Sequence, residues 1–119
     1  MDNHDLKAKT KLFAIDMLSF LKTLPNGYET HVISKQLLRS TTSFAANYRA
    51  ACRGRSKREF YAKLSIVVEE TDETMFWLEI LIESGMVNNS VSNALLFRAT
   101  EFVKIFSKAR KTISDQLNS

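Results

Sequence analysis

The sequence contains few of the residues that form turns and cross-links. Its 119 residues include one cysteine, one proline and three glycines. The proline is grouped with Asn26 and Gly27, so the chain lacks the many turn residues that a β-rich fold needs. The single cysteine, Cys52, has no second cysteine in the chain with which to form a disulfide. These scarcities favour an all-α protein.

Long hydrophobic runs are also missing. A transmembrane helix needs roughly 18 apolar residues, and no run approaches that length. Two apolar runs, residues 66–68 and 75–82, are both flanked by carboxylates. The first eleven residues, MDNHDLKAKTK, lack the apolar centre of a signal peptide. We therefore expect a cytoplasmic protein with no membrane partner.

Catalytic and cofactor signatures are absent too. Cys52 has no histidine near it in the sequence, the serines form no nucleophile elbow, and the glycines form no phosphate-binding loop. The carboxylates of residues 69–73, EETDE, suggest an acidic metal site or a general acid/base pair. However, neither His4 nor His31 belongs to the Glu-x-x-His motif of di-iron bundles. We expect no enzyme activity, no metal and no cofactor.

The sequence does contain four segments with apolar residues at helical spacing. They cover residues 6–24, 30–54, 57–84 and 89–117. Because the breaks between them are short, neighbouring helices are expected to run antiparallel. The pattern predicts an up-down-up-down four-helix bundle, with residues 1–119 forming one domain.

Individual residues predict how these helices begin and end. Gly54 is expected to close the second helix in a left-handed conformation. Ser56 and Glu59 form a capping-box pattern at the start of the third helix. Gly85 is expected to end that helix, and Val91 is expected to point inward from the fourth.

Two of the predicted helices have unusually wide apolar faces. Leu12, Ile15 and Leu18 widen the stripe of the first helix, and Trp77 and Ile80 widen that of the third. Such surface exceeds what one seam of a monomeric bundle requires, which favours contact with another subunit. The alternative is that these residues are all buried within a monomer.

Polar residues on the second and third helices predict a cross-helix ion pair. If these helices pack antiparallel around a turn near residue 55, Arg39 lies level with Glu70 and Glu73. We expect Arg39 and Glu70 to pair and fix the register of the two helices. Desolvation offsets much of the attraction, so the net gain in stability is expected to be small.

A basic stretch carries the main hypothesis about function. Five positive charges fall within ten positions: Arg49, Arg53, Arg55, Lys57 and Arg58. They are expected at one corner of the bundle, where they could bind nucleic-acid phosphates. In the alternative interpretation, Arg49 pairs inside the bundle and the others form a solvated corner. No aromatic residue is interleaved with these charges, so base-specific recognition is not expected.

A family resemblance lies in residues 41–87, which read TTSFAANYRAACRGRSKREFYAKLSIVVEETDETMFWLEILIESGMV. The small polar run before AANYRAA, the basic turn ending in Ser-Lys, and WLEILIE carry it. This stretch resembles the bacterial four-helix bundle proteins encoded by intervening sequences inside 23S ribosomal RNA genes. The resemblance implies a small all-α protein that assembles into a ring, often a pentamer, without known enzymatic activity.

The stretch is also similar to the accessory proteins of diversity-generating retroelements. Their barrels of five bundles bind nucleic acid and a reverse transcriptase. The resemblance implies that the basic turn, residues 49–58, contacts nucleic acid and that Arg39 and Glu70 make the contact between the second and third helices.

Three functions follow from these observations. The first is a homo-oligomeric bundle that binds structured RNA or DNA at the basic corner, as an accessory in a ribonucleoprotein. The second is a protein-protein adaptor or scaffold with no nucleic-acid role. The third, an enzyme acting through residues 69–73, has the least support.

Overall fold

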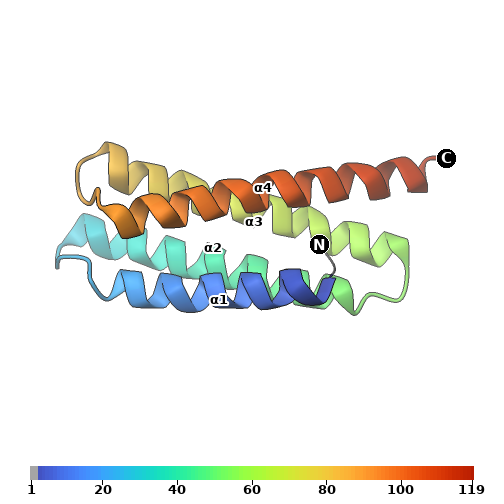
Figure 1. The fold of residues 1–119 in the computed structure, drawn as a ribbon, viewed down its shortest axis with the longest axis horizontal. Helices are drawn as coiled ribbons and strands as arrows, with labels where there is room; N and C mark the ends of the chain where they lie inside the picture. The colour runs from blue at the N-terminus through green and yellow to red at the C-terminus, as the bar shows by residue number, and fades with distance from the viewer. Residues whose placement is uncertain (1–2) are drawn as a thin grey trace.

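The structure, a computed structural model, describes residues 3–119. Over that range the chain forms four α-helices and no strand: α1 Asn3–Leu21, α2 Tyr28–Cys52, α3 Lys57–Glu83 and α4 Ser90–Leu117. Consecutive helices run in opposite directions along a rod 49 Å long (Figure 1). The predicted all-α fold of four helices is confirmed.

Local side-chain hydrogen bonds explain where α3 and α4 begin. The Ser56 hydroxyl accepts a hydrogen bond from the Glu59 amide at 3.1 Å, and the Glu59 carboxylate accepts one from the Arg55 amide at 2.6 Å. At α4, Asn89 and Ser92 form a reciprocal capping box. The Ser56 and Asn89 side chains satisfy amides of the first helical turn that have no partner within the helix, whereas the Arg55 amide precedes α3.

The prediction of a left-handed cap at Gly54 is wrong. The end of α2 is capped at Arg53, which has a φ of −98°, and Gly54 does not have a positive φ. Instead, the space around Gly54 is tight: a β-carbon there would lie 3.1 Å from the Ala51 carbonyl oxygen and 3.4 Å from the Phe60 nitrogen. Gly85, with a φ of 81°, does adopt the left-handed conformation after α3.

Three phenylalanines form an aromatic level near the middle of the rod. The ring centroids of Phe13, Phe44 and Phe102 lie 5.6–5.8 Å apart, so α1, α2 and α4 meet there. Phe13 and Phe44 are completely buried. Burying side chains of this size contributes about 1.5–3 kcal/mol each, so this level is a main source of stability.

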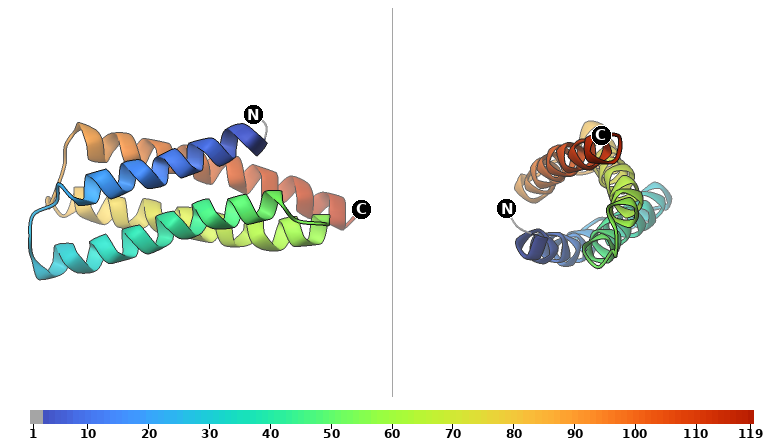
Figure 2. Two further views of the ribbon diagram at one scale, coloured as in Figure 1. Left: turned by 90° about the horizontal axis from the view of Figure 1, so that it is seen from below. Right: turned by 90° about the vertical axis from the view of Figure 1, so that its right-hand side faces the viewer.

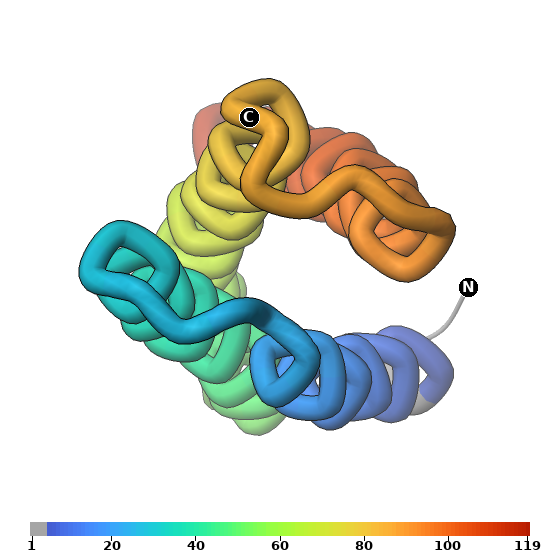
Figure 3. Tube along the Cα trace, turned by 90° about the vertical axis from the view of Figure 1, so that its left-hand side faces the viewer, coloured from blue at the N-terminus to red at the C-terminus, as the bar shows by residue number. Residues whose placement is uncertain are grey.

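The four helices form an open arc with α1 and α4 at its ends (Figures 2 and 3). Helix α1 packs mainly on α2, and α4 mainly on α3. Across the opening, Arg98 Nη1 lies 2.8 Å from Asp16 Oδ2, and the Arg98 guanidinium lies over the Phe13 ring at 5.0 Å. These contacts tie α1 to α4 near the middle of the rod.

The open arc leaves apolar side chains at the surface. Val91 is 53% exposed, so the prediction that it points inward is wrong. It lies in the first turn of α4 and lines an open groove between α1 and α4. Leu12, Ile15 and Leu18, the residues that widen the apolar face of α1, are also exposed. The alternative in which they are all buried within the monomer therefore does not hold. No helix among the described residues is apolar over a stretch long enough to cross a bilayer.

Candidate nucleic-acid interface

The fold brings positive charges from three segments of the chain to one end of the rod. The N-terminus of α1, the turn between α2 and α3, and the C-terminus of α4 all lie at the same end (Figure 1). We call this half of the rod, residues 3–12, 44–69 and 103–119, the basic end. It contains 13 Lys and Arg residues but only four acidic ones. The remaining half, residues 13–43 and 70–102, is the acidic end, with four basic and eight acidic residues.

The predicted corner lies at the tip of the basic end. Arg53 caps α2, Arg55 lies in the turn, and Lys57 and Arg58 occupy the first turn of α3; all four are exposed. Positive charges at a helix N-terminus oppose the helix dipole, so helix stability does not account for Lys57 and Arg58. Within the described residues, none of the four forms a salt bridge.

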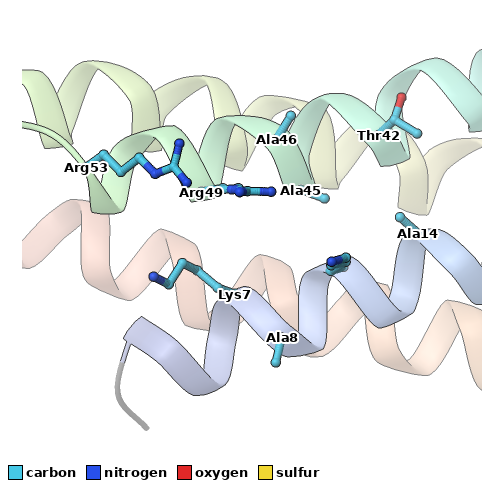
Figure 4. A pocket seen from close by; sticks show the side chains of 9 residues that line it. Lys7, Ala8, Ala14, Thr42, Ala45, Ala46, Arg49 and Arg53 are labelled. Carbon is cyan, nitrogen blue, oxygen red and sulfur yellow. The ribbon is translucent and has the colours of Figure 1, made fainter.

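Arg49 lies one turn before Arg53 and is also exposed. It pairs with no carboxylate in the part of the chain that the structure describes. The interpretation in which Arg49 pairs inside the bundle therefore does not hold. Instead, Arg49 and Arg53 extend along the surface where α2 meets α1 (Figure 4).

Two lysines of α1 complete a basic groove that sequence reasoning missed. Lys7 and Lys11 line it from α1, and Arg49 and Arg53 line it from α2. Figure 4 labels Lys7 and the two arginines. The groove has a volume of about 600 Å³. The signal was available: Lys7 and Lys11 have the same four-residue spacing as the two arginines, and antiparallel packing of the first two helices sets the pairs side by side.

The predicted contact between Arg39 and Glu70 lies in the acidic end, away from these cations. Arg39 Nη1 lies 2.9 Å from Glu70 Oε2, and Nη2 contacts the Glu73 carboxylate. Beneath them, the buried Thr74 hydroxyl donates a hydrogen bond to the Ser40 oxygen at 2.8 Å. These polar contacts join α2 to α3, and their role in fixing the register of the two helices stays a prediction.

Comparison with known proteins identifies the family. The sequence profile of the 23S rRNA-intervening sequence proteins matches residues 2–108. The chain belongs to this family. The family resemblance found in residues 41–87 is thus confirmed and extends over most of the chain.

A solved structure of a relative agrees with this assignment. It is a protein with unknown function from the S23 ribosomal protein family of Bacteroides thetaiotaomicron, 34% identical to this chain. The match covers 93% of this chain and 99% of that one, with a TM-score of 0.82. No curated protein matches the sequence.

In this 23S rRNA-intervening sequence protein, the cations of α4 at the basic end differ in availability. Arg110 Nε donates a hydrogen bond to the Ser65 hydroxyl at 2.8 Å, and its guanidinium lies over the Tyr61 ring at 5.1 Å. Lys111 lies 3.6 Å from Asp115. Lys108 is exposed, and no described residue pairs with it. Lys108 can therefore contribute to the surface of the basic end, whereas Arg110 holds α4 against α3.

The carboxylates of residues 69–73 do not converge on a metal site. Among the described residues, no three His, Cys, Asp or Glu side chains lie close enough to hold a metal ion. Two of these carboxylates, Glu70 and Glu73, contact Arg39. Cys52 is half-buried and packs against the core. Pairing with Arg39 accounts for Glu70 and Glu73, and packing against the core accounts for Cys52.

Proposed function

We propose that the protein is a non-enzymatic, homo-oligomeric four-helix bundle that binds structured RNA or DNA through its basic corner, as an accessory in a ribonucleoprotein. The observation that supports this most is the exposure of Arg49, Arg53, Arg55, Lys57 and Arg58 at one end of the rod, where none of them forms a salt bridge with a described residue. Exposed Lys and Arg side chains bind phosphates by releasing counterions, which requires no catalytic group. The family name, 23S rRNA-intervening sequence protein, is consistent with this role.

We also propose that the protein assembles into a ring, with a pentamer as the expected form. Support comes from the exposed apolar side chains on α1 and α4, among them Leu12, Ile15, Val91 and Phe97. Phe97 is 67% exposed, and a contact with a second copy would remove its ring from water. A ring would present several basic corners along one rim, which increases the avidity for a long nucleic acid.

The oligomeric state can be measured by light scattering coupled to size-exclusion chromatography. We expect a mass five times that of the 13.6-kDa chain. Replacing Leu12 and Phe97 with Asp is expected to give monomers that keep their helical circular dichroism. A wild-type protein with the mass of one chain would overturn the ring.

Nucleic-acid binding can be tested with a fluorescently labelled, structured RNA at rising salt. The Arg55→Glu/Arg58→Glu variant should bind at least tenfold more weakly than wild type at 0.1 M salt. The matched control is Lys22→Glu/Lys35→Glu, which changes the net charge equally at the acidic end. Equal binding by the two variants would contradict the proposal, and so would a wild-type protein that binds no RNA at low salt.

The exposed apolar surface also supports a second candidate, a protein-protein adaptor. A second groove between α1 and α4, separate from the one at Val91, is lined by Leu12, Phe97 and Phe102. An adaptor would capture a stoichiometric protein partner that survives nuclease treatment and high salt. It would also retain that partner in the Arg55→Glu/Arg58→Glu variant.

A further inference from the structure

The groove between α1 and α2 has cations on both walls. Lys7 and Lys11 are one helical turn apart on α1, and Arg49 and Arg53 are one turn apart on α2, which is about 6 Å in each case. Lys7 is half-buried and the other three are exposed. None forms an ion pair with any residue that the structure describes. Four cations therefore face a common trough without a negative charge to balance them.

Small side chains line the trough between the cations. Ala8, Ala14, Ala45 and Ala46 are among its lining residues, together with Thr42. Among the residues that the structure describes, no carboxylate lines the trough to repel an anion. An anionic chain can therefore approach both helices closely and contact the cations on either side.

We infer that this trough holds the phosphate backbone of a single-stranded stretch of RNA or DNA. The inference rests on the proposed function and extends the same site from the corner onto α1. Cations one turn apart match the spacing of successive phosphates in an extended strand, and the two walls allow contacts from both sides. Residues that the sequence did not single out, Lys7 and Lys11, thereby join the binding site.

The dimensions of the trough favour one strand over a duplex. Neighbouring helix axes lie about 8–10 Å apart, which limits the width of the trough between them. The major groove of a duplex is already about 12 Å wide, and the whole duplex is wider still, so a duplex cannot enter the trough. A duplex would rest on the rim, beyond the reach of the half-buried Lys7. Because no aromatic side chain lines the trough, the contacts are to phosphates, and binding does not depend on base sequence.

A helix from another protein fits these walls less well. The alanines that line the trough offer little apolar area to bury, and each of the four cations would need its own carboxylate. A strand of nucleic acid supplies one charge per nucleotide, so it balances the walls along their length.

The test compares Lys7→Gln/Lys11→Gln with the control Lys22→Gln/Lys35→Gln, which removes the same charge at the acidic end. The probes are a labelled single-stranded oligonucleotide of mixed sequence and its duplex with the complementary strand. Losing two phosphate contacts lowers the salt slope by about 1.4, and at 0.1 M salt it weakens single-strand binding by about 25-fold. The control should stay within about twofold of wild type, and the duplex should lose less affinity than the single strand.

A second variant guards against an effect of Lys7 on folding. Arg49→Gln/Arg53→Gln removes the opposite wall and should weaken single-strand binding to a similar extent. Circular dichroism and thermal unfolding of both variants should match those of the wild-type protein.

Three results would overturn the inference. If wild type binds the single strand but Lys7→Gln/Lys11→Gln equals the control, the groove is not the site, although the proposed function stands. If the variant instead changes the mass measured by light scattering and leaves oligonucleotide binding intact, the groove is a subunit interface. If wild type binds neither probe, the inference and the proposed function fail together.

Discussion

At the basic end of the bundle, the turn between α2 and α3 passes through Gly54, where a β-carbon would crowd the Ala51 carbonyl. At the acidic end, the chain leaves α3 through Gly85 in the left-handed conformation, with no atom near its missing β-carbon. The basic end has nine more positive than negative charges, and the acidic end has four more negative than positive. Both ends are built from the same four helices, yet their turns and charges differ.

The comparison shows that the net charge of each end depends on which segments the antiparallel helices bring together there. It does not follow the order of residues along the sequence. Residues 1–60 have an excess of six positive charges, and residues 61–119 an excess of two negative ones. Folding brings Lys108, from residues 61–119, to the same end of the rod as the cations of residues 1–60. The field at the basic end is therefore stronger than the sequence halves indicate.

The largest predicted effect concerns the aromatic level that separates the two ends. Phe44 is fully buried between Phe13 and Phe102. Replacing it with Ala leaves a cavity, so the free energy of unfolding should fall by about 3–5 kcal/mol in a chemical denaturation experiment. Tyr28→Ala, at a site that is 80% exposed and lies outside the proposed subunit contact, should change it by less than about 0.5 kcal/mol. A small loss at Phe44 would show that the level does not hold the ends together.

The next effect separates the two glycine turns. Gly54→Ala should cost about 1–3 kcal/mol of stability through crowding, and Gly85→Ala about 1–2 kcal/mol through backbone strain. Asparagine tolerates the left-handed conformation, so Gly85→Asn should recover much of that loss, whereas Gly54→Asn should recover none. Thermal unfolding of the four variants measures this. If Gly54→Asn also recovered stability, backbone strain rather than crowding would explain the need for glycine in both turns.

A smaller effect is expected at the contact between Arg39 and Glu70. Arg39 is 49% exposed, so solvent screens the pair, and Arg39→Gln should lower stability by only about 0.5–1 kcal/mol. A double-mutant cycle with Glu70→Gln measures the coupling between the two side chains. A coupling energy of several kcal/mol would show that the pair, rather than the apolar core, holds α2 against α3.

The smallest effect sharpens the comparison of charges. Glu29→Gln/Glu83→Gln removes two exposed carboxylates of the acidic end. The rod is 49 Å long, and salt at 0.1 M screens charges beyond about 10 Å. RNA binding at the basic end should therefore change by less than about twofold. A larger change would indicate that nucleic acid also reaches the acidic end.

The sequence predicts the helices well because their apolar spacing and capping residues are local signals. Ser56 and Asn89 set the starts of α3 and α4 through hydrogen bonds within four residues. Antiparallel packing around a turn near residue 55 also placed Arg39 level with Glu70. Both the caps and this ion pair could be predicted because each depends on one helix or on two consecutive helices.

The wrong or missing predictions concern features that depend on how particular helix surfaces pack together. Val91 has the spacing of an inward residue, but whether it is covered depends on how far α1 lies from α4. The conformation of Gly54 depends on how closely α3 starts after α2. Lys7 and Lys11 were missed because they lie far from the basic stretch in sequence and approach it only when α1 packs on α2.

The arc of helices has a consequence for how the chain folds. Because extensive packing joins helices that follow one another in the sequence, most contacts close short loops, and the relative contact order is low. Each hairpin can therefore form before the more distant contact between α1 and α4. We expect refolding on a microsecond-to-millisecond timescale in stopped-flow or temperature-jump experiments.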